Sequence, residues 1–96
     1  MMPLFVLEYR FPECTERRLS VRPRHRAYLD ELKASRKLVA AGPWADDSGA
    51  LLVYAAESEA ELERLLADDP YVLENVFGEC VLREWRPIIG GALKVP

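Results

Sequence analysis

Short stretches in which apolar residues alternate with other residues recur along the chain, and this period of two is typical of β-strands. The first stretch lies near the amino terminus, where every second residue from Phe5 to Phe11 is aromatic or aliphatic. Leu4 and Val6 make the other face of the same strand apolar, which a sheet covered on only one side does not need. The pattern predicts strands at residues 4–11, 38–41, 50–55 and 77–85.

Apolar residues at helical spacing predict a first helix over residues 22–36. Pro23 suits the first turn of this helix, because proline has no N–H to leave unpaired there. The polar residues 14–20 are then expected to form a connection between the first strand and the helix.

A second helix is predicted to begin at Ser58. Ser58 is followed three residues later by Glu61, which is the spacing of a capping box. The helix is expected to end near Asp69, because Pro70 disfavours the helical region for the residue before it. A short turn through Tyr71 then leads to the last strand.

The predicted elements follow one another in the order β-α-β-β-α-β within 96 residues. With right-handed crossovers, this order gives a four-stranded antiparallel sheet with both helices on one face, the ferredoxin-like α+β arrangement. We expect a single domain over residues 1–96, with residues 87–96 as a tail that the pattern does not place. Because the uncovered sheet face would be apolar, we also predict a homodimer that packs through its sheet faces.

The charge of the chain limits the partners that we expect. There are 13 basic and 16 acidic residues, for a formal net charge of −3, which argues against a surface adapted to nucleic acid or to an anionic membrane. The first residues lack the features of a signal peptide, and no apolar stretch is long enough to span a bilayer. We therefore expect a cytoplasmic protein.

Two cysteines, Cys14 and Cys80, lie far apart in the sequence. A disulfide between them is compatible with this spacing but not required, and we interpret both as reduced thiols. Cys14 is a weak candidate for a nucleophile, because only nearby arginines could activate it. With one histidine and no C-x-x-C pair, the sequence predicts neither a metal site nor another cofactor.

His25 is the only histidine and the first candidate for catalysis, because histidine exchanges a proton near neutral pH. At 100° per residue it lies on the apolar stripe of the first helix with Leu29 and Leu32. Such a residue is either a general base or acid beside a pocket, or a core histidine that hydrogen-bonds a neighbour. The residues expected to point away from the stripe are Arg24, Asp30, Glu31 and Lys33.

Asp69 is the candidate partner of His25. In a ferredoxin-like fold the start of the first helix and the end of the second can share one edge of the sheet. A carboxylate there can accept the N–H of one imidazole nitrogen and leave the other nitrogen to move a proton. It can also cap the short turn that begins at Pro70, and the two roles are compatible.

Five arginines lie within residues 17–26, at a predicted helix start where free N–H groups favour anions. Arg18, Arg22 and Ser20 are predicted to bind an anionic substrate group, because they flank the turn that faces inward. The arginines interpreted as solvated surface residues are Arg17, Arg24 and Arg26.

Gly42 and Pro43 follow the second apolar run. They either shape the wall of a pocket or only end the strand, since both residues are common terminators.

Three segments resemble, in order and spacing, those of the YCII-related proteins. They are R-L-S-V-R-P-x-H at residues 18–25, L-V-A-A-G-P at residues 38–43 and A-D-D-P-Y-V at residues 67–72. The resemblance implies a dimeric α/β-barrel of ferredoxin-like protomers, with His25 and Asp69 as the active-site pair. It also implies a chemical precedent, the removal of chloride from a chlorinated hydroxylated aromatic compound. The chain departs from its relatives at residues 35–37, where a glycine is common, and in the short link at residues 43–49, which bears on pocket size.

These features predict a small lyase or isomerase in which His25 removes a proton and Asp69 holds the imidazole. The substrate would be an anionic or hydroxylated molecule, aromatic by the family precedent. The alternative is a non-catalytic dimeric module that binds a small anion or a protein partner.

Overall fold

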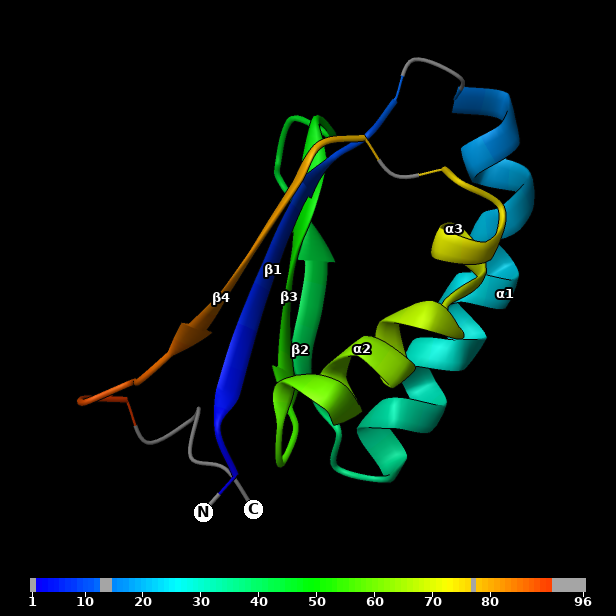
Figure 1. Cartoon of the computed structure of the whole chain (residues 1–96). Coiled ribbons are helices and arrows are strands. Elements are labelled where there is room, and N and C mark those ends of the chain that lie inside the picture. Colours follow the sequence, from blue (N-terminus) through cyan, green and yellow to red (C-terminus); the bar gives the residue numbers. More distant parts are fainter. Residues whose placement is uncertain (1, 13–14, 77, 91–96) are drawn as a thin grey trace.

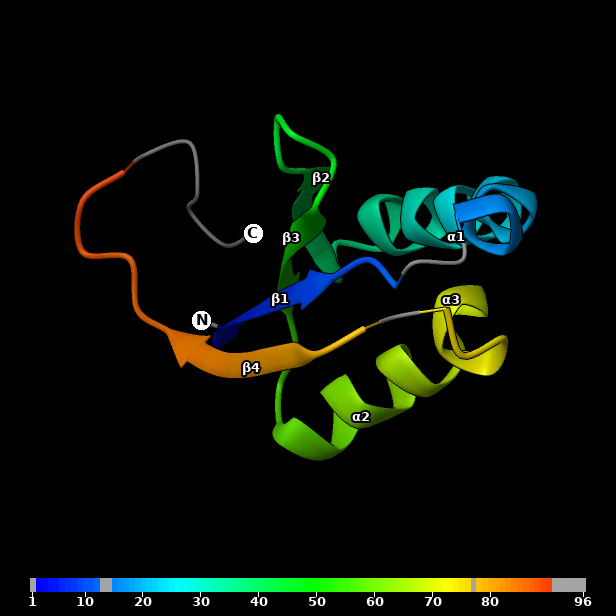
Figure 2. The ribbon, with the colours of Figure 1, turned by 90° about the horizontal axis from the view of Figure 1, so that it is seen from above.

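The helices and strands of the computed structural model occur in the predicted order. The structure describes residues 2–12, 15–76 and 78–90. Its four antiparallel strands are ordered β2-β3-β1-β4, and the helices lie on one face of the sheet (Figures 1 and 2). This arrangement confirms the ferredoxin-like α+β fold. The elements are β1 Leu4–Arg10, α1 Thr15–Ala34, β2 Leu38–Pro43, β3 Gly49–Ala55, α2 Glu59–Ala67, α3 Pro70–Leu73 and β4 Cys80–Trp85.

The two central strands, β1 and β3, carry most of the core. On the helix side Leu7 pairs with Leu52, and both are buried. They belong to one apolar cluster with Val21 and Leu29 of α1 and Leu62 of α2. Truncation of a buried leucine to alanine typically costs about 2–5 kcal/mol, so this cluster fixes how the helices lie over the sheet.

Helix α1 begins about two turns earlier than the sequence pattern predicts. It starts at Thr15, so residues 15–20 of the predicted polar connection are helical and Pro23 lies in the helix interior. Pro23 cannot donate to the carbonyl of Leu19, but Leu19 is exposed and its carbonyl can bind water. Packing supports the added turns, because the Arg18 guanidinium lies 3.9 Å above the centre of the Phe11 ring.

Helix α1 also ends two residues earlier than predicted, at Ala34. Arg36 follows with a φ of 65°, in the left-handed region, and the N–H of Lys37 bonds to the carbonyl of Leu32 at 2.8 Å. Glycine is favoured at such a position after a helix. Arg36 takes this position here, and its backbone turns the chain from α1 towards β2.

The edge strands differ from their predicted bounds. Strand β2 includes Gly42 and Pro43, which were predicted to end it. An edge strand tolerates proline, because one side of its backbone has no partner strand. Strand β4 begins at Cys80, later than predicted, and Phe77 lies outside the described residues.

Ser58 caps α2 as predicted. Its hydroxyl oxygen accepts from the N–H of Glu61 at 3.1 Å, and the Glu61 carboxylate accepts from the N–H of Glu57 at 3.2 Å. This is a capping box whose second bond goes to the residue before the cap. Lys37 donates to the same carboxylate at 3.0 Å, and that hydrogen bond holds the pKa of Glu61 below its ordinary value.

The sheet face opposite the helices is partly apolar. Leu4, Val53 and Ala55 form a second, small cluster there. By register, Val81 and Trp85 of β4 share this face, and they are 53% and 38% exposed. The apolar outer face that the sequence predicts is therefore present, together with charged side chains from β1 and β4.

The residues that follow β4 form neither helix nor strand as far as residue 90. Ile88 and Ile89 are almost fully exposed in this segment. Within the described ranges, no helix has the length and apolar character needed to cross a membrane.

Candidate functional site

His25 of α1 and Asp69, which lies between α2 and α3, form a buried hydrogen-bonded pair. Nδ1 of the imidazole lies 2.7 Å from Oδ1 of Asp69, and the two residues are 5% and 1% exposed. The topology brings them together across 44 positions in the sequence, as predicted. A carboxylate only accepts hydrogen bonds, so a neutral imidazole here carries its proton on Nδ1 and its lone pair on Nε2.

Asp69 is also the N-cap residue of α3. Its Oδ1 accepts from the N–H of Tyr71 at 2.9 Å, and Pro70 occupies the first turn of this helix. The Asp69 side chain therefore makes both contacts that the sequence predicts for it, the hydrogen bond to His25 and the cap of α3. The cap holds the carboxylate in place before any ligand arrives, which preorganises the imidazole.

Tyr71 covers one face of the imidazole. The two rings stack with 3.7 Å between their centroids and 6° between their planes. Burial is the main cause that raises the pKa of the Tyr71 phenol, so the phenol is neutral at physiological pH. The stack and the hydrogen bond to Asp69 together hold the imidazole in one orientation.

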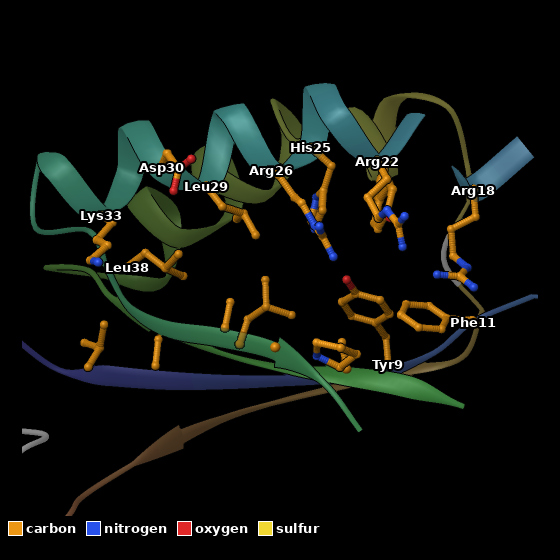
Figure 3. A pocket seen from close by; sticks show the side chains of 18 of the residues that line it. Tyr9, Phe11, Arg18, Arg22, His25, Arg26, Leu29, Asp30, Lys33 and Leu38 are labelled. Atoms are coloured by element: carbon orange, nitrogen blue, oxygen red, sulfur yellow. The ribbon is translucent and has the colours of Figure 1, made fainter. Parts of the chain in front are cut away.

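A cavity of about 570 Å³ opens between α1 and the strands β2 and β3, and His25 lies in its wall (Figure 3). This volume lies within the range of small-molecule sites. Helix α1 contributes the cations Arg18, Arg22 and Arg26 to the wall. The apolar part of the wall comes from Leu29, Leu38, Ala40, Ala41, Ala50 and Leu52.

Arg18 is the most buried cation of the cavity. It is 7% exposed, it stacks on Phe11, and its Nε has no hydrogen-bond partner among the described residues. A buried donor without a partner costs free energy until an anion or water completes its hydrogen bonds. This arrangement therefore suits the anionic group of a ligand.

Three α1 residues that were predicted to lie away from the site line the cavity instead. They are Arg26, Asp30 and Lys33. The buried stripe of α1 faces the sheet, whereas the cavity opens along the flank of the helix towards the edge strand β2. Residues beside the stripe therefore reach the cavity while they remain accessible to water.

The other predicted binding residues divide into two groups. Arg22, Gly42 and Pro43 line the cavity, but Ser20 does not. Ser20 is exposed, and its hydroxyl donates to the carbonyl of Arg17 at 2.8 Å. The early start of α1 is the cause, because a helical residue at this position faces away from the sheet.

Cys80 lies away from the site described above. Cys80 is exposed on β4 with a free thiol, and Cys14 lies outside the described residues. Across residues 2–12, 15–76 and 78–90, no group of three or more histidine, cysteine or acidic side chains is arranged to hold a metal ion.

Comparison with known proteins identifies the family. Residues 2–86 match the model of the YCII-related domain. The chain belongs to the YCII-related family. An uncharacterised protein of Haemophilus influenzae is 29% identical over 87 residues, which cover 80% of this chain and 89% of that protein. The resemblance seen in the sequence is thereby confirmed over nearly the whole chain.

Solved structures share the fold of this YCII-related protein. The 5-chloro-2-hydroxyhydroquinone dehydrochlorinase of Burkholderia phenoliruptrix, solved with 2,5-dihydroxybenzoquinone, matches with a TM-score of 0.74 and 27% identity over 86% of this chain and 93% of that one. A protein of Pseudomonas aeruginosa matches with a TM-score of 0.62 and 12% identity over 93% and 97% of the two chains. The likeness to the Pseudomonas aeruginosa protein shows the fold alone. The likeness to the Burkholderia phenoliruptrix protein is a likeness to a dehydrochlorinase.

Three aromatic residues of the cavity wall, Tyr9, Phe11 and Tyr71, were not among the site residues predicted from the sequence. Tyr71 follows the Asp69-Pro70 dipeptide directly, and this position was the signal that could have placed it beside the pair. Tyr9 lies on the alternating apolar face of the first predicted strand, with Phe5, Leu7 and Phe11. Its inward direction follows from the period of two, but the pattern does not distinguish the core from the wall of a cavity.

Proposed function

We propose that this protein is a small-molecule enzyme of the lyase or isomerase type, in which His25 removes a proton from the substrate. The observation that carries the proposal is the 2.7 Å contact between Nδ1 of His25 and Oδ1 of Asp69 beside the cavity. A general base must present a lone pair to its substrate, and the bond to Asp69 leaves that lone pair on Nε2. Once the proton is taken, the carboxylate stabilises the imidazolium.

The substrate of this reaction is an anionic or hydroxylated molecule with an apolar or aromatic body. Arg18 and Arg22 hold the anionic group, and this role is supported by Nε of Arg18, which has no hydrogen-bond partner in the described parts of the chain. On the strand side, the cavity wall carries small side chains such as Ala41 and Ala50, which leaves room for the body of the ligand. The likeness to a dehydrochlorinase of a chlorinated hydroquinone supports the same substrate class.

Release of chloride from 5-chloro-2-hydroxyhydroquinone by the purified protein tests this function. We expect a rate above that in buffer, in proportion to the protein concentration, because a base beside an anion-binding cavity is suited to elimination. An unsaturated lactone assayed in parallel tests whether the protein is an isomerase instead of a lyase. Saturable binding of both compounds without conversion of either would favour the non-catalytic binding module.

We also propose that the protein is a homodimer that packs through the outer sheet faces. The exposed Val81 and Trp85 on that face support the proposal. Light scattering should give about twice the chain mass of 10.9 kDa. Val81→Lys should weaken the dimer, because a buried ammonium is costly, whereas Leu73→Lys, at an exposed position of α3, should not. A monomer at micromolar concentration would contradict the proposal.

A further inference from the structure

Tyr9 is a buried residue of β1 whose phenol reaches the cavity. It is 3% exposed and lines the same cavity as His25. In Figure 3 its ring stands up from the sheet with the hydroxyl towards α1, while His25 points down from α1 towards the sheet. The phenol and the imidazole therefore face the cavity from opposite walls.

The surroundings of Tyr9 keep its phenol neutral. Burial raises the pKa of Tyr9 well above its ordinary value, and the Asp69 carboxylate and Tyr71 raise it further. The Arg18 guanidinium acts in the opposite sense, because it favours negative charge at the same place. At physiological pH, Tyr9 is thus an O–H donor carried by a central strand and set beside a cation.

We infer that Tyr9 is a second catalytic residue, whose O–H donates to the substrate oxygen on which negative charge develops as His25 removes a proton. The inference rests on the function proposed above and narrows its substrate class. The substrate is an enolisable carbonyl compound, or the keto form of a hydroxylated ring, in which the C–H bond that breaks is next to the carbonyl carbon. The acidic hydrogen can then meet His25 while the oxygen meets Tyr9.

The electrons balance without an oxidant or a further reactant. The C–H bond breaks, its proton goes to Nε2 of His25, its electron pair forms a C=C bond, and the carbonyl π pair moves to the oxygen. Tyr9 and Arg18 stabilise that oxyanion, as hydrogen-bond donors fixed in place before the reaction do. The carbonyl then reforms in one of two ways. Either another carbon of the conjugated system takes the proton back from His25, or the next carbon expels an anion such as chloride as a C=C bond forms.

The test compares the Tyr9→Phe variant with the parent protein in calorimetric binding of 2,5-dihydroxybenzoquinone. This probe ionises at its hydroxyl groups and so presents an enolate-type oxyanion. Loss of one hydrogen bond to a charged oxygen should weaken binding by roughly 10- to 100-fold. Tyr54→Phe is the matched control, because Tyr54 is a buried phenol on the neighbouring β3, has no hydrogen-bond partner among the described residues and does not line the cavity.

Equal affinity of the parent and the Tyr9→Phe variant for the probe would overturn the inference, and so would the absence of binding to the parent. In the chloride-release assay, Tyr9→Phe should lower kcat more than it changes KM, because the oxyanion forms only as the reaction proceeds. The outcomes separate this inference from the proposed function. A parent protein that binds the probe but converts nothing would contradict proton transfer by His25, whereas a Tyr9→Phe variant that binds and reacts like the parent would contradict the role of Tyr9 alone.

Discussion

Replacement of His25 by asparagine is expected to lower kcat by about 10²- to 10⁴-fold, the usual contribution of a general base. The asparagine amide can still donate to Oδ1 of Asp69 from near the position of Nδ1, so the buried carboxylate keeps a partner. The basic Nε2 is lost. The variant therefore removes the proposed chemistry and preserves the hydrogen bond that holds α1 against the start of α3. Chloride release measures the rate, and circular dichroism shows that the fold is kept.

Alanine at the same position tests the structural contribution of the imidazole. It leaves Asp69, 1% exposed, without its side-chain partner and removes the stack on Tyr71. Breaking such a buried pair costs about 3–5 kcal/mol, so His25→Ala should lower Tm as well as kcat. Arg24→Ala is the matched control, because Arg24 is exposed on the same helix and lies off the cavity. A folded His25→Asn variant that works at the parental rate would contradict the role of His25.

The sequence predicts the fold well where an element is determined by residues close to one another in the chain. The alternation from Phe5 to Phe11 specifies β1, and Ser58 caps α2 as expected. The meeting of His25 and Asp69 also follows, since the order of the elements dictates which helix ends share a sheet edge. These predictions use the period of the apolar residues, the capping chemistry and the handedness of the crossovers.

The parts that the sequence does not predict depend on tertiary packing. The polar residues 15–20 carry no apolar stripe, and Pro23 is a common helix start, so the early turns of α1 become evident only from the stack of Arg18 on Phe11. The same packing turns Ser20 away from the cavity. Tyr9 faces inward in either case, and its place in the cavity wall follows from how far α1 stands from β2 and β3.

Asp69→Asn separates the charge of the carboxylate from its two hydrogen-bonding roles, the cap of α3 and the orientation of the imidazole. Asparagine caps helices about as well as aspartate, so stability should change by about 1 kcal/mol or less. Oδ1 makes both the cap bond to Tyr71 and the contact with Nδ1, so an amide oxygen at its position keeps both hydrogen bonds and keeps the neutral imidazole protonated on Nδ1. The amide carries no charge, however, to stabilise an imidazolium. We therefore expect kcat to fall by about 10²-fold or more.

The ring nitrogens of His25 report whether the imidazole keeps its orientation in the variant. In both the parent protein and Asp69→Asn, ¹⁵N NMR should show the neutral imidazole protonated on Nδ1, so a fall in kcat with this tautomer unchanged reports the lost charge. Asp68→Asn is the matched control, because the adjacent Asp68 is exposed and the carboxylate that binds His25 is left intact. If Asp69→Asn keeps the parental tautomer and also the parental rate, the charge of the carboxylate plays no part in catalysis. Asp69 would then serve only as a hydrogen-bond acceptor that holds His25 and caps α3.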